Sequence, residues 1–327
     1  MEKKTFLVTG ATGYIGFSLI KHLLSLDSNN VHKIVGVYRD ESKLQQHPEI
    51  LNHEKVKFVR IESLDNDCLE CILREMNLEP HYIIHCAAMT QSLEMVKRPV
   101  EVIESIVNTT QHIMELAKNN HAKSVVYLSS MEVYGDVTCT EDRFVSEDTL
   151  GNIDILNSRS CYPLAKRMAE NICYSYYAEY SVPVKIVRLA QTFGNGILKT
   201  DNRVFAQFAR AVQNNHDIVL HTNGNSMGNY CGITDVISAI MILLERGKNG
   251  EAYNVTNEEN TMTIKEMAML VADKVADGNI RVVFDIPDEN IYGYAQETGL
   301  KLSSEKLRRL GWAPTKNLED MYREILQ

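Results

Sequence analysis

Two patterns of apolar and polar residues alternate along the first half of the chain. Short runs that are apolar throughout predict strands covered on both faces, and they lie at residues 5–10, 32–38, 56–61, 81–88, 123–130 and 182–190. Between these runs, apolar residues recur at helical spacing, which predicts helices at 14–26, 68–76 and 100–120 and one that starts near Tyr162. Strand–helix alternation of this kind predicts an α/β fold with a doubly wound parallel sheet.

The second half of the chain is less regular. It predicts helices at residues 203–213, 235–247, 263–275 and 318–326, and short strands at 217–222, 251–256 and 280–286. The sequence contains no repeat, no low-complexity tract and no clear linker. We therefore expect two interwoven lobes: a larger domain over 1–189, to which 228–256 returns, and a smaller C-terminal α/β lobe over 190–327 that binds substrate.

Composition excludes several classes of protein. The chain has 327 residues and a net charge of −9 without basic runs, which argues against a nucleic-acid partner and against an anionic membrane surface. No apolar run approaches the length of a membrane span, and the three apolar residues behind Lys3 and Lys4 are too few for a signal peptide. Seven scattered cysteines fit reduced thiols in the cytoplasm. The lone pair Cys68 and Cys71 gives no reason to expect a metal.

Three glycines mark the turn between the first strand and the first helix. Gly10, Gly13 and Gly16 stand in "VTGATGYIG" at three-residue spacing. Such a turn lets the backbone approach a pyrophosphate, and the following helix N-terminus supplies N–H donors and a favourable dipole. Because the turn opens the first βαβ unit, we interpret it as a nucleotide-binding turn of a Rossmann-type fold.

The end of the second strand bears on the choice of cofactor. In an NAD-binding domain this strand ends with an acid that binds the adenosine ribose, but here Tyr38 and Arg39 stand in its place. An arginine can hold a 2′-phosphate through two hydrogen bonds. This favours NADP(H), whereas NAD(H) is the alternative if Asp40 binds the ribose.

Candidate chemistry follows the fifth predicted strand. Ser130 lies just beyond its carboxyl end, where reactive groups gather in such sheets, and Tyr162 and Lys166 stand one helical turn apart. The motifs "TGATGYIG", "HCAA", "SSMEVYG", Tyr162-x-x-x-Lys166 and "LGWAP" occur in one order. In this the chain resembles, over essentially its whole length, the extended short-chain dehydrogenases/reductases, which include NAD(P)-dependent nucleotide-sugar epimerases, dehydratases, decarboxylases and ketoreductases.

The resemblance implies a role for each of these three residues. Tyr162 would exchange a proton with a sugar hydroxyl or carbonyl, although a free tyrosine has a pKa of about 10. The Lys166 ammonium would lower that pKa and would also bind the nicotinamide ribose. Ser130 would bind the substrate oxygen.

The resemblance also implies a wider set of binding residues. Ala87 and Ala88 would run beside the cofactor pyrophosphate, and Gln191 replaces an asparagine that is usual in the family. His85 is expected to be a core residue. Thr12, Tyr14 and Ile15 in the glycine turn would also contact the cofactor. Glu62 matches an acidic position of the family that lies near the adenine.

Departures from the family pattern reduce the number of reactions that the chain is expected to catalyse. Met131 stands where 4,6-dehydratases carry an acid, which disfavours that reaction, whereas Glu132 matches the glutamate that uronate decarboxylases keep. Met131 is expected to contact the substrate. Gly228 stands where most of the family carries an arginine for the sugar diphosphate, and Arg203 is a candidate replacement.

These observations favour a reductase of a nucleotide-activated keto-sugar in the synthesis of surface-glycan precursors. The alternatives are a nucleotide-sugar 4-epimerase with tightly bound NAD and a nucleotide-uronate decarboxylase. Family members commonly dimerise through helices that correspond to residues 92–118 and to the helix near 161, so a homodimer is expected.

Overall fold

The computed structural model describes residues 4–26, 31–45, 48–61, 66–137, 144–197, 201–287 and 297–326. The chain divides into two compact units. The first comprises Met1–Gly135, Asn152–Arg188 and Ile237–Tyr253, and the second comprises Asp136–Gly151, Leu189–Val236 and Asn254–Gln327. The chain therefore passes between the units several times.

A seven-stranded sheet forms the centre of the first unit. Its strand order is β10-β6-β5-β4-β1-β2-β3, and the registered pairs of β1 with β2 and β4, of β2 with β3 and of β4 with β5 are parallel. The chain order reverses at β1, as a doubly wound sheet requires. The strands are β1 (Thr5–Thr9), β2 (Lys33–Tyr38), β3 (Val56–Arg60), β4 (Tyr82–His85), β5 (Ser124–Ser130), β6 (Val184–Leu189) and β10 (Ala252–Val255).

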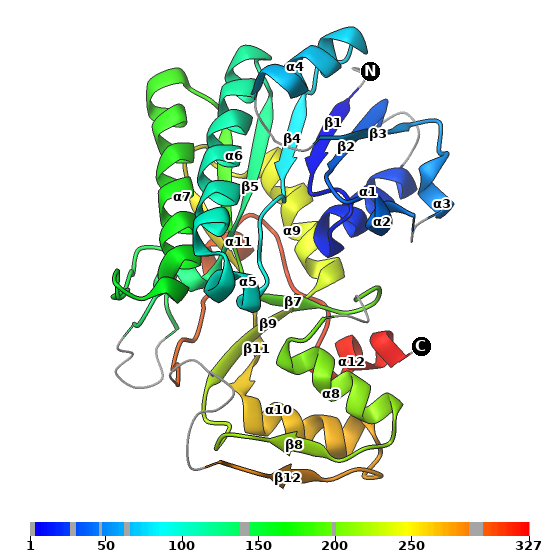
Figure 1. Ribbon diagram of the computed structural model, residues 1–327, viewed down its shortest axis with the longest axis vertical. Coiled ribbons are helices and arrows are strands. Elements are labelled where there is room, and N and C mark those ends of the chain that lie inside the picture. Colours follow the sequence, from blue (N-terminus) through cyan, green and yellow to red (C-terminus); the bar gives the residue numbers. More distant parts are fainter. Residues whose placement is uncertain are drawn as a thin grey trace. The chain divides into compact units, whose positions relative to one another are not determined.

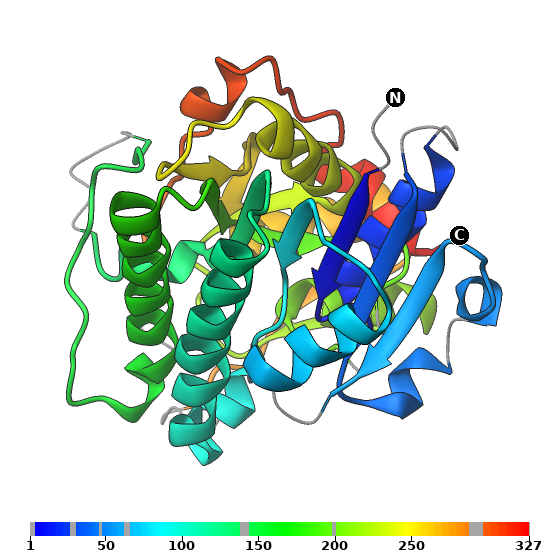
Figure 2. The same ribbon diagram turned by 90° about the horizontal axis from the view of Figure 1, so that it is seen from above.

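Helices cover both faces of this sheet, which confirms the predicted fold class (Figures 1 and 2). On one face lie α4 (Asn66–Glu75), α6 (Pro99–Asn119) and α7 (Cys161–Tyr180); on the other lie α1 (Tyr14–Ser25) and most of α9 (Ile233–Arg246). Burial on both faces explains why β1 and β6 consist entirely of buried residues. Shorter helical segments are α2 (Glu41–Leu44), α3 (Pro48–Leu51), α5 (Ser92–Lys97) and the 3-10 turns η1 (Met131–Tyr134) and η2 (Ser158–Ser160).

The second unit has a separate core built around aromatic rings. Phe193 stacks on Phe205 with ring centroids 4.5 Å apart, and Tyr230 and Tyr322 meet Phe193 edge-on. Its strands are β7 (Gln191–Phe193), β8 (Ile218–Leu220), β9 (Met227–Gly232), β11 (Asn257–Thr263) and β12 (Val282–Phe284). Its helices are α8 (Val204–Gln213), α10 (Ile264–Leu270), the π-helical turn η3 (Val271–Val275), α11 (Glu305–Arg308) and α12 (Leu318–Leu326).

The sequence pattern predicted the long elements better than the short ones. The helix expected at 100–120 is α6, and the run at 251–256 is β10. Strands β7, β9 and β11 were not predicted, because each carries polar or glycine residues that interrupt the apolar pattern. Within the part of the chain that the structure describes, no helix combines the length and the hydropathy needed to cross a membrane.

Candidate active site

The glycine turn after β1 leaves no room for a side chain at Gly10 or Gly16. Gly10 has a φ of +65°, and a Cβ atom there would lie 2.9 Å from the backbone nitrogen of Ala87. A Cβ on Gly16 would lie only 2.3 Å from the carbonyl oxygen of Gly10. The Gly13 N–H donates to that same carbonyl at 2.9 Å. Backbone crowding therefore requires glycine at positions 10 and 16.

The N-terminus of α1 has features suited to binding an anion. Gly13 is its N-cap residue and provides no side-chain cap, and the first turn contains no acidic residue. Tyr14 and Ile15, the first helical residues, are half-buried, and Thr12 is buried in the turn. Backbone N–H groups at such an end, together with the helix dipole, suit a pyrophosphate.

A buried hydrogen-bond chain fixes the "HCAA" segment against this turn. Thr9 Oγ1 lies 2.7 Å from Nδ1 of His85 and accepts a hydrogen bond from the Ala87 N–H at 3.2 Å. Burial lowers the pKa of His85 to about 3, and the charge of Lys166 adds to the effect. His85 is thus a neutral core residue, as expected. These hydrogen bonds hold Ala87 beside Gly10, and half-buried Ala88 follows in the sequence.

Two arginines stand together at the carboxyl ends of β2 and β3. Arg39 and Arg60 are both exposed, and Arg60 Nε lies 3.4 Å from the carbonyl oxygen of Arg39. Asp40 instead caps α2, accepting hydrogen bonds from the Ser42 N–H at 3.0 Å and the Ser42 hydroxyl at 2.7 Å. Arg60 was not identified from the sequence. Glu62, the expected adenine contact, lies outside the described residues.

Tyr162 and Lys166 lie one turn apart on α7 and both are buried. The Lys166 ammonium donates a 2.7 Å hydrogen bond to the carbonyl oxygen of Leu128 in β5. It lies 4.8 Å from the ring centroid of Tyr127 and 5.9 Å from that of Tyr162. Burial lowers the pKa of Lys166 to about 8, while the charge of Glu170 acts in the opposite direction. A buried cation thus lies beside the tyrosine ring.

Ser130 ends β5 and begins the 3-10 turn η1. Its Oγ accepts a hydrogen bond from the Glu132 N–H at 3.2 Å. Met131, next in the chain, is half-buried. The Arg167 Nε donates to the carbonyl oxygen of Val133 at 2.7 Å, which ties this turn to α7. Ser130 and Glu132 are therefore held close to the helix that carries Tyr162.

Glu132 has an ionic partner that sequence reasoning missed. Arg159 Nη2 lies 3.0 Å from Glu132 Oε2 and 3.2 Å from Oε1. The Asn157 side chain accepts from the Arg159 N–H at 2.9 Å, which fixes the backbone of η2. About a third of each side chain of the ion pair is exposed. The only sequence signal was an arginine three residues before Tyr162.

A second charged network lies buried behind the site. Arg188 in β6 binds Glu170 in α7 through Nη2 to Oε2 at 2.7 Å and Nε to Oε1 at 3.0 Å. The Ser129 hydroxyl donates to Glu170 Oε1 at 2.6 Å, and Arg188 Nη1 donates to the Tyr134 hydroxyl at 3.0 Å. Burial disfavours the charged form of Arg188, but the hydrogen bonds and the charge of Glu170 raise the pKa of Arg188 above its ordinary value.

The second unit holds the other residues expected to contact substrate. Gln191 is half-buried at the start of β7. The Arg203 guanidinium is engaged by Asp201, with Nη2 2.5 Å and Nε 3.1 Å from its carboxylate oxygens. A Cβ on Gly228 would lie 2.3 Å from the Tyr230 hydroxyl, so the ring of Tyr230 fills the space next to this glycine.

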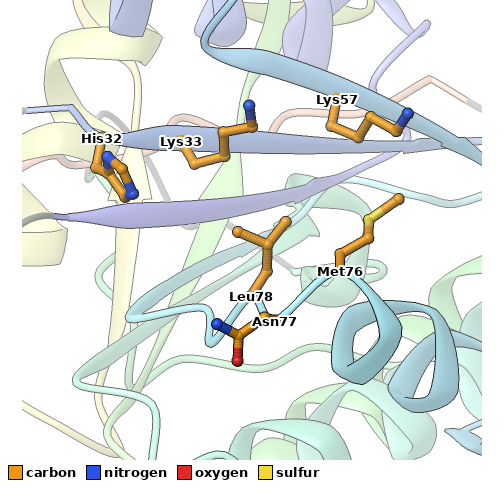
Figure 3. A pocket seen from close by; sticks show the side chains of 6 residues that line it. All are labelled: His32, Lys33, Lys57, Met76, Asn77 and Leu78. Carbon is orange, nitrogen blue, oxygen red and sulfur yellow. The ribbon is translucent and has the colours of Figure 1, made fainter.

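A pocket of about 410 Å³ lies at the opposite end of the large sheet. It opens where β2 and β3 begin, whereas the glycine turn and Ser130 follow the carboxyl ends of their strands. Figure 3 shows its lining side chains, which are His32, Lys33, Lys57, Met76, Asn77 and Leu78. This pocket is therefore separate from the candidate active site.

The doubly wound fold, together with a family match over most of the chain, defines an enzyme of the extended short-chain dehydrogenase/reductase type. Residues 6–256 match the NAD dependent epimerase/dehydratase family, and the chain belongs to that family.

Relatives with different reactions match the chain at similar levels. A dTDP-D-glucose 4,6-dehydratase from Dictyostelium discoideum is 28% identical over 76% of this chain, a match that spans 57% of that relative's length. UDP-glucuronic acid decarboxylase 6 from Arabidopsis thaliana is 26% identical over 96% of this chain and 85% of its own. The structure of a Thermotoga maritima UDP-glucose 4-epimerase with UDP-glucose has a TM-score of 0.81 at 21% identity, covering 98% and 97% of the two chains. The family is therefore established, whereas the similarities do not select one reaction.

Proposed function

We propose that this protein is an NADPH-dependent reductase of a nucleotide-activated keto-sugar that serves as a surface-glycan precursor. The observation that carries the proposal is the buried Lys166 ammonium beside Tyr162, one turn away on α7. Reduction of a carbonyl needs a proton donor at the oxygen and a hydride donor at the carbon. The Tyr162–Lys166 pair supplies the first requirement, and the glycine turn suits the cofactor that meets the second.

The chain's own residues account for the proton. Ser130 would donate a hydrogen bond to the substrate carbonyl oxygen and polarise its carbon. Tyr162 would give its hydroxyl proton to that oxygen as the new C–H bond forms, so that the carbonyl becomes an alcohol. The resulting tyrosinate would be stabilised by the Lys166 ammonium. A proton from solvent then restores Tyr162.

The residues present fit a nicotinamide dinucleotide. Gly10 and Gly16 permit a tight backbone turn after β1, and the end of α1 is suited to the pyrophosphate. When bound, the nicotinamide donates a hydride. Arg39 and Arg60, whose Nε lies 3.4 Å from the Arg39 carbonyl oxygen, would hold a 2′-phosphate, since a guanidinium group binds a phosphate dianion through charge-assisted hydrogen bonds.

The substrate would be a nucleotide-diphosphate sugar held by the second unit. This part of the proposal is supported by the relatives, which act on nucleotide-activated sugars. Met131 and Gln191 would contact the sugar. Arg203, held by Asp201 in the structure, would meet the diphosphate only by exchanging that partner. Because Gly228 has no charged side chain, the diphosphate would be held differently from the way it is held in family members that carry an arginine at this position.

Cofactor binding tests the proposal first. Purified protein is checked for retained nucleotide and is then titrated separately with NADPH and NADH, using cofactor fluorescence. We expect reversible binding that favours NADPH, and a loss of about tenfold or more in NADPH affinity for Arg39→Ala and for Arg60→Ala, because a charge-assisted hydrogen bond contributes about 1.5–3 kcal/mol. NADH affinity should be unchanged. Retained NAD without preference for the phosphate would contradict the reductase.

A specific observation favours a second candidate. Glu132 is paired with Arg159 beside Ser130, which places a carboxylate where a general base would be needed. Retained NAD would favour a nucleotide-uronate decarboxylase or a 4-epimerase. Incubation with a UDP-uronic acid distinguishes these two, because only the decarboxylase releases CO₂.

A homodimer in the cytoplasm completes the proposal. Exposed apolar side chains lie on α5, α6 and α7, among them Val100, which is 64% exposed, and Met168, which is 52% exposed. Pairing these helices with those of a second copy would bury such side chains. Light scattering that gives the mass of one chain at micromolar concentration would contradict the dimer.

A further inference from the structure

Lys166 lies in an environment that opposes its charge. Only 3% of this residue is exposed, and its ammonium has a neutral carbonyl, that of Leu128, as hydrogen-bond acceptor. The ring of Tyr127 in β5 and that of Tyr162 in α7 lie beside it. The other groups that act on its charge are the neutral His85 at the end of β4, the half-buried Cys86 that follows it, and Glu170 and Cys173 from α7. Burial raises the pKa of both thiols above the ordinary value. Glu170 is thus the anion among the facing groups.

Glu170 follows Lys166 by one helical turn and is itself fixed. Two hydrogen bonds to Arg188 hold both carboxylate oxygens, and Ser129 donates to one of them at 2.6 Å. Ser129 immediately precedes Ser130 in β5. The carboxylate therefore joins α7, β6 and the strand end that carries Ser130. Arg188 extends the connection to Tyr134 at the end of η1.

We propose that Glu170, clamped by Arg188 and Ser129, is a positioning residue that keeps Lys166 charged and aligns β5 with α7 in the hydride-transfer site. The inference rests on the proposed function of Tyr162 and Lys166. An ion pair of two buried residues is weak evidence for stability by itself. Its place between the charged lysine and the strand of Ser130 indicates a role in the site.

The first test is the pH dependence of turnover. In Glu170→Gln, Lys166 should lose its proton at lower pH, so the alkaline limb of the kcat profile for keto-sugar reduction should move down by about one unit. The double variant Glu170→Gln/Arg188→Met leaves no unpaired buried ion and keeps the test available if the single variant fails to fold. Its limb should move in the same direction but less far, because the repulsion between Arg188 and Lys166 is lost as well. A structural role would lower kcat without moving the limb, and an unmoved limb would overturn the inference.

The second test needs no turnover. The pH at which the effect of Lys166→Met on the free energy of unfolding begins to fall reports the titration of Lys166 in the folded protein. This pH should be about one unit lower in the Glu170→Gln background than in the wild-type background. The same pH in both backgrounds would overturn the inference, whereas a shift in a protein that reduces no keto-sugar would leave Glu170 in its role and contradict the proposed reductase.

A pair of serines provides the matched control. Ser129 and Ser124 are both buried in β5, and each is hydrogen-bonded to a charged side chain. Ser124 binds Lys185 at the amino end of the strand. Ser129→Ala should lower kcat several-fold, whereas Ser124→Ala should leave kcat unchanged. Equal effects of the two substitutions would contradict a specific connection to the site.

Discussion

Replacing Lys166 with methionine should stabilise the protein while abolishing its catalysis. Burial lowers the pKa of Lys166 from 10.5 to about 8, and at about 1.4 kcal/mol per pKa unit the charged form costs the folded state about 3 kcal/mol at neutral pH. Methionine removes that cost. It also leaves the Leu128 carbonyl without its donor, which costs about 1–3 kcal/mol. The net gain expected for Lys166→Met is therefore about 1 kcal/mol.

The pH dependence of this gain has a definite sign. Between about 8 and 10.5 the unfolded chain keeps the lysine proton that the folded protein releases. The wild type therefore gains stability as pH rises through this window. The advantage of Lys166→Met should be largest below pH 8 and should be lost above it, as measured by urea denaturation from pH 7 to 10. A variant that is less stable at pH 7, or an advantage that is equal at pH 7 and 10, would refute this reasoning.

A matched lysine separates stability from catalysis. Burial also lowers the pKa of Lys185 to about 8. Its ammonium donates to Ser124 at 2.8 Å, at the amino end of β5. Lys185→Met should therefore show a similar pH-dependent change in stability with turnover retained, whereas Lys166→Met should lose turnover.

Two further predictions concern glycines. Gly16→Ala should weaken NADPH binding by at least tenfold in a fluorescence titration, because its Cβ would lie 2.3 Å from the Gly10 carbonyl oxygen and would deform the turn; unchanged affinity would contradict the assigned site. Gly228→Ala should lower the melting temperature by several degrees, because its Cβ would lie 2.3 Å from the Tyr230 hydroxyl. Gly299→Ala, with open space around its Cβ position, is the control, and equal melting temperatures for these two variants would contradict the crowding argument.

Local patterns in the sequence were sufficient for the fold class and for the motifs. Uniformly apolar runs predicted the strands of the central sheet because helices cover both of its faces. The spacing of Gly10, Gly13 and Gly16 predicted the tight turn that the structure contains. Tyr162 and Lys166 could be placed on one helix because their four-residue spacing is a property of the helix itself.

Tertiary structure decided which side chains act together across the sheet. Glu132 and Arg159 are 27 residues apart, and Glu170 and Arg188 are 18 apart, so no local periodicity connects them. Each pair forms because parallel strands and the helices that follow them bring distant segments to the same end of the sheet. The sequence by itself determined the turn and the helix that carry the candidate chemistry. Packing between β5, β6 and α7 decided the charge environment of Lys166, since burial and the partners of Glu170 depend on all three elements.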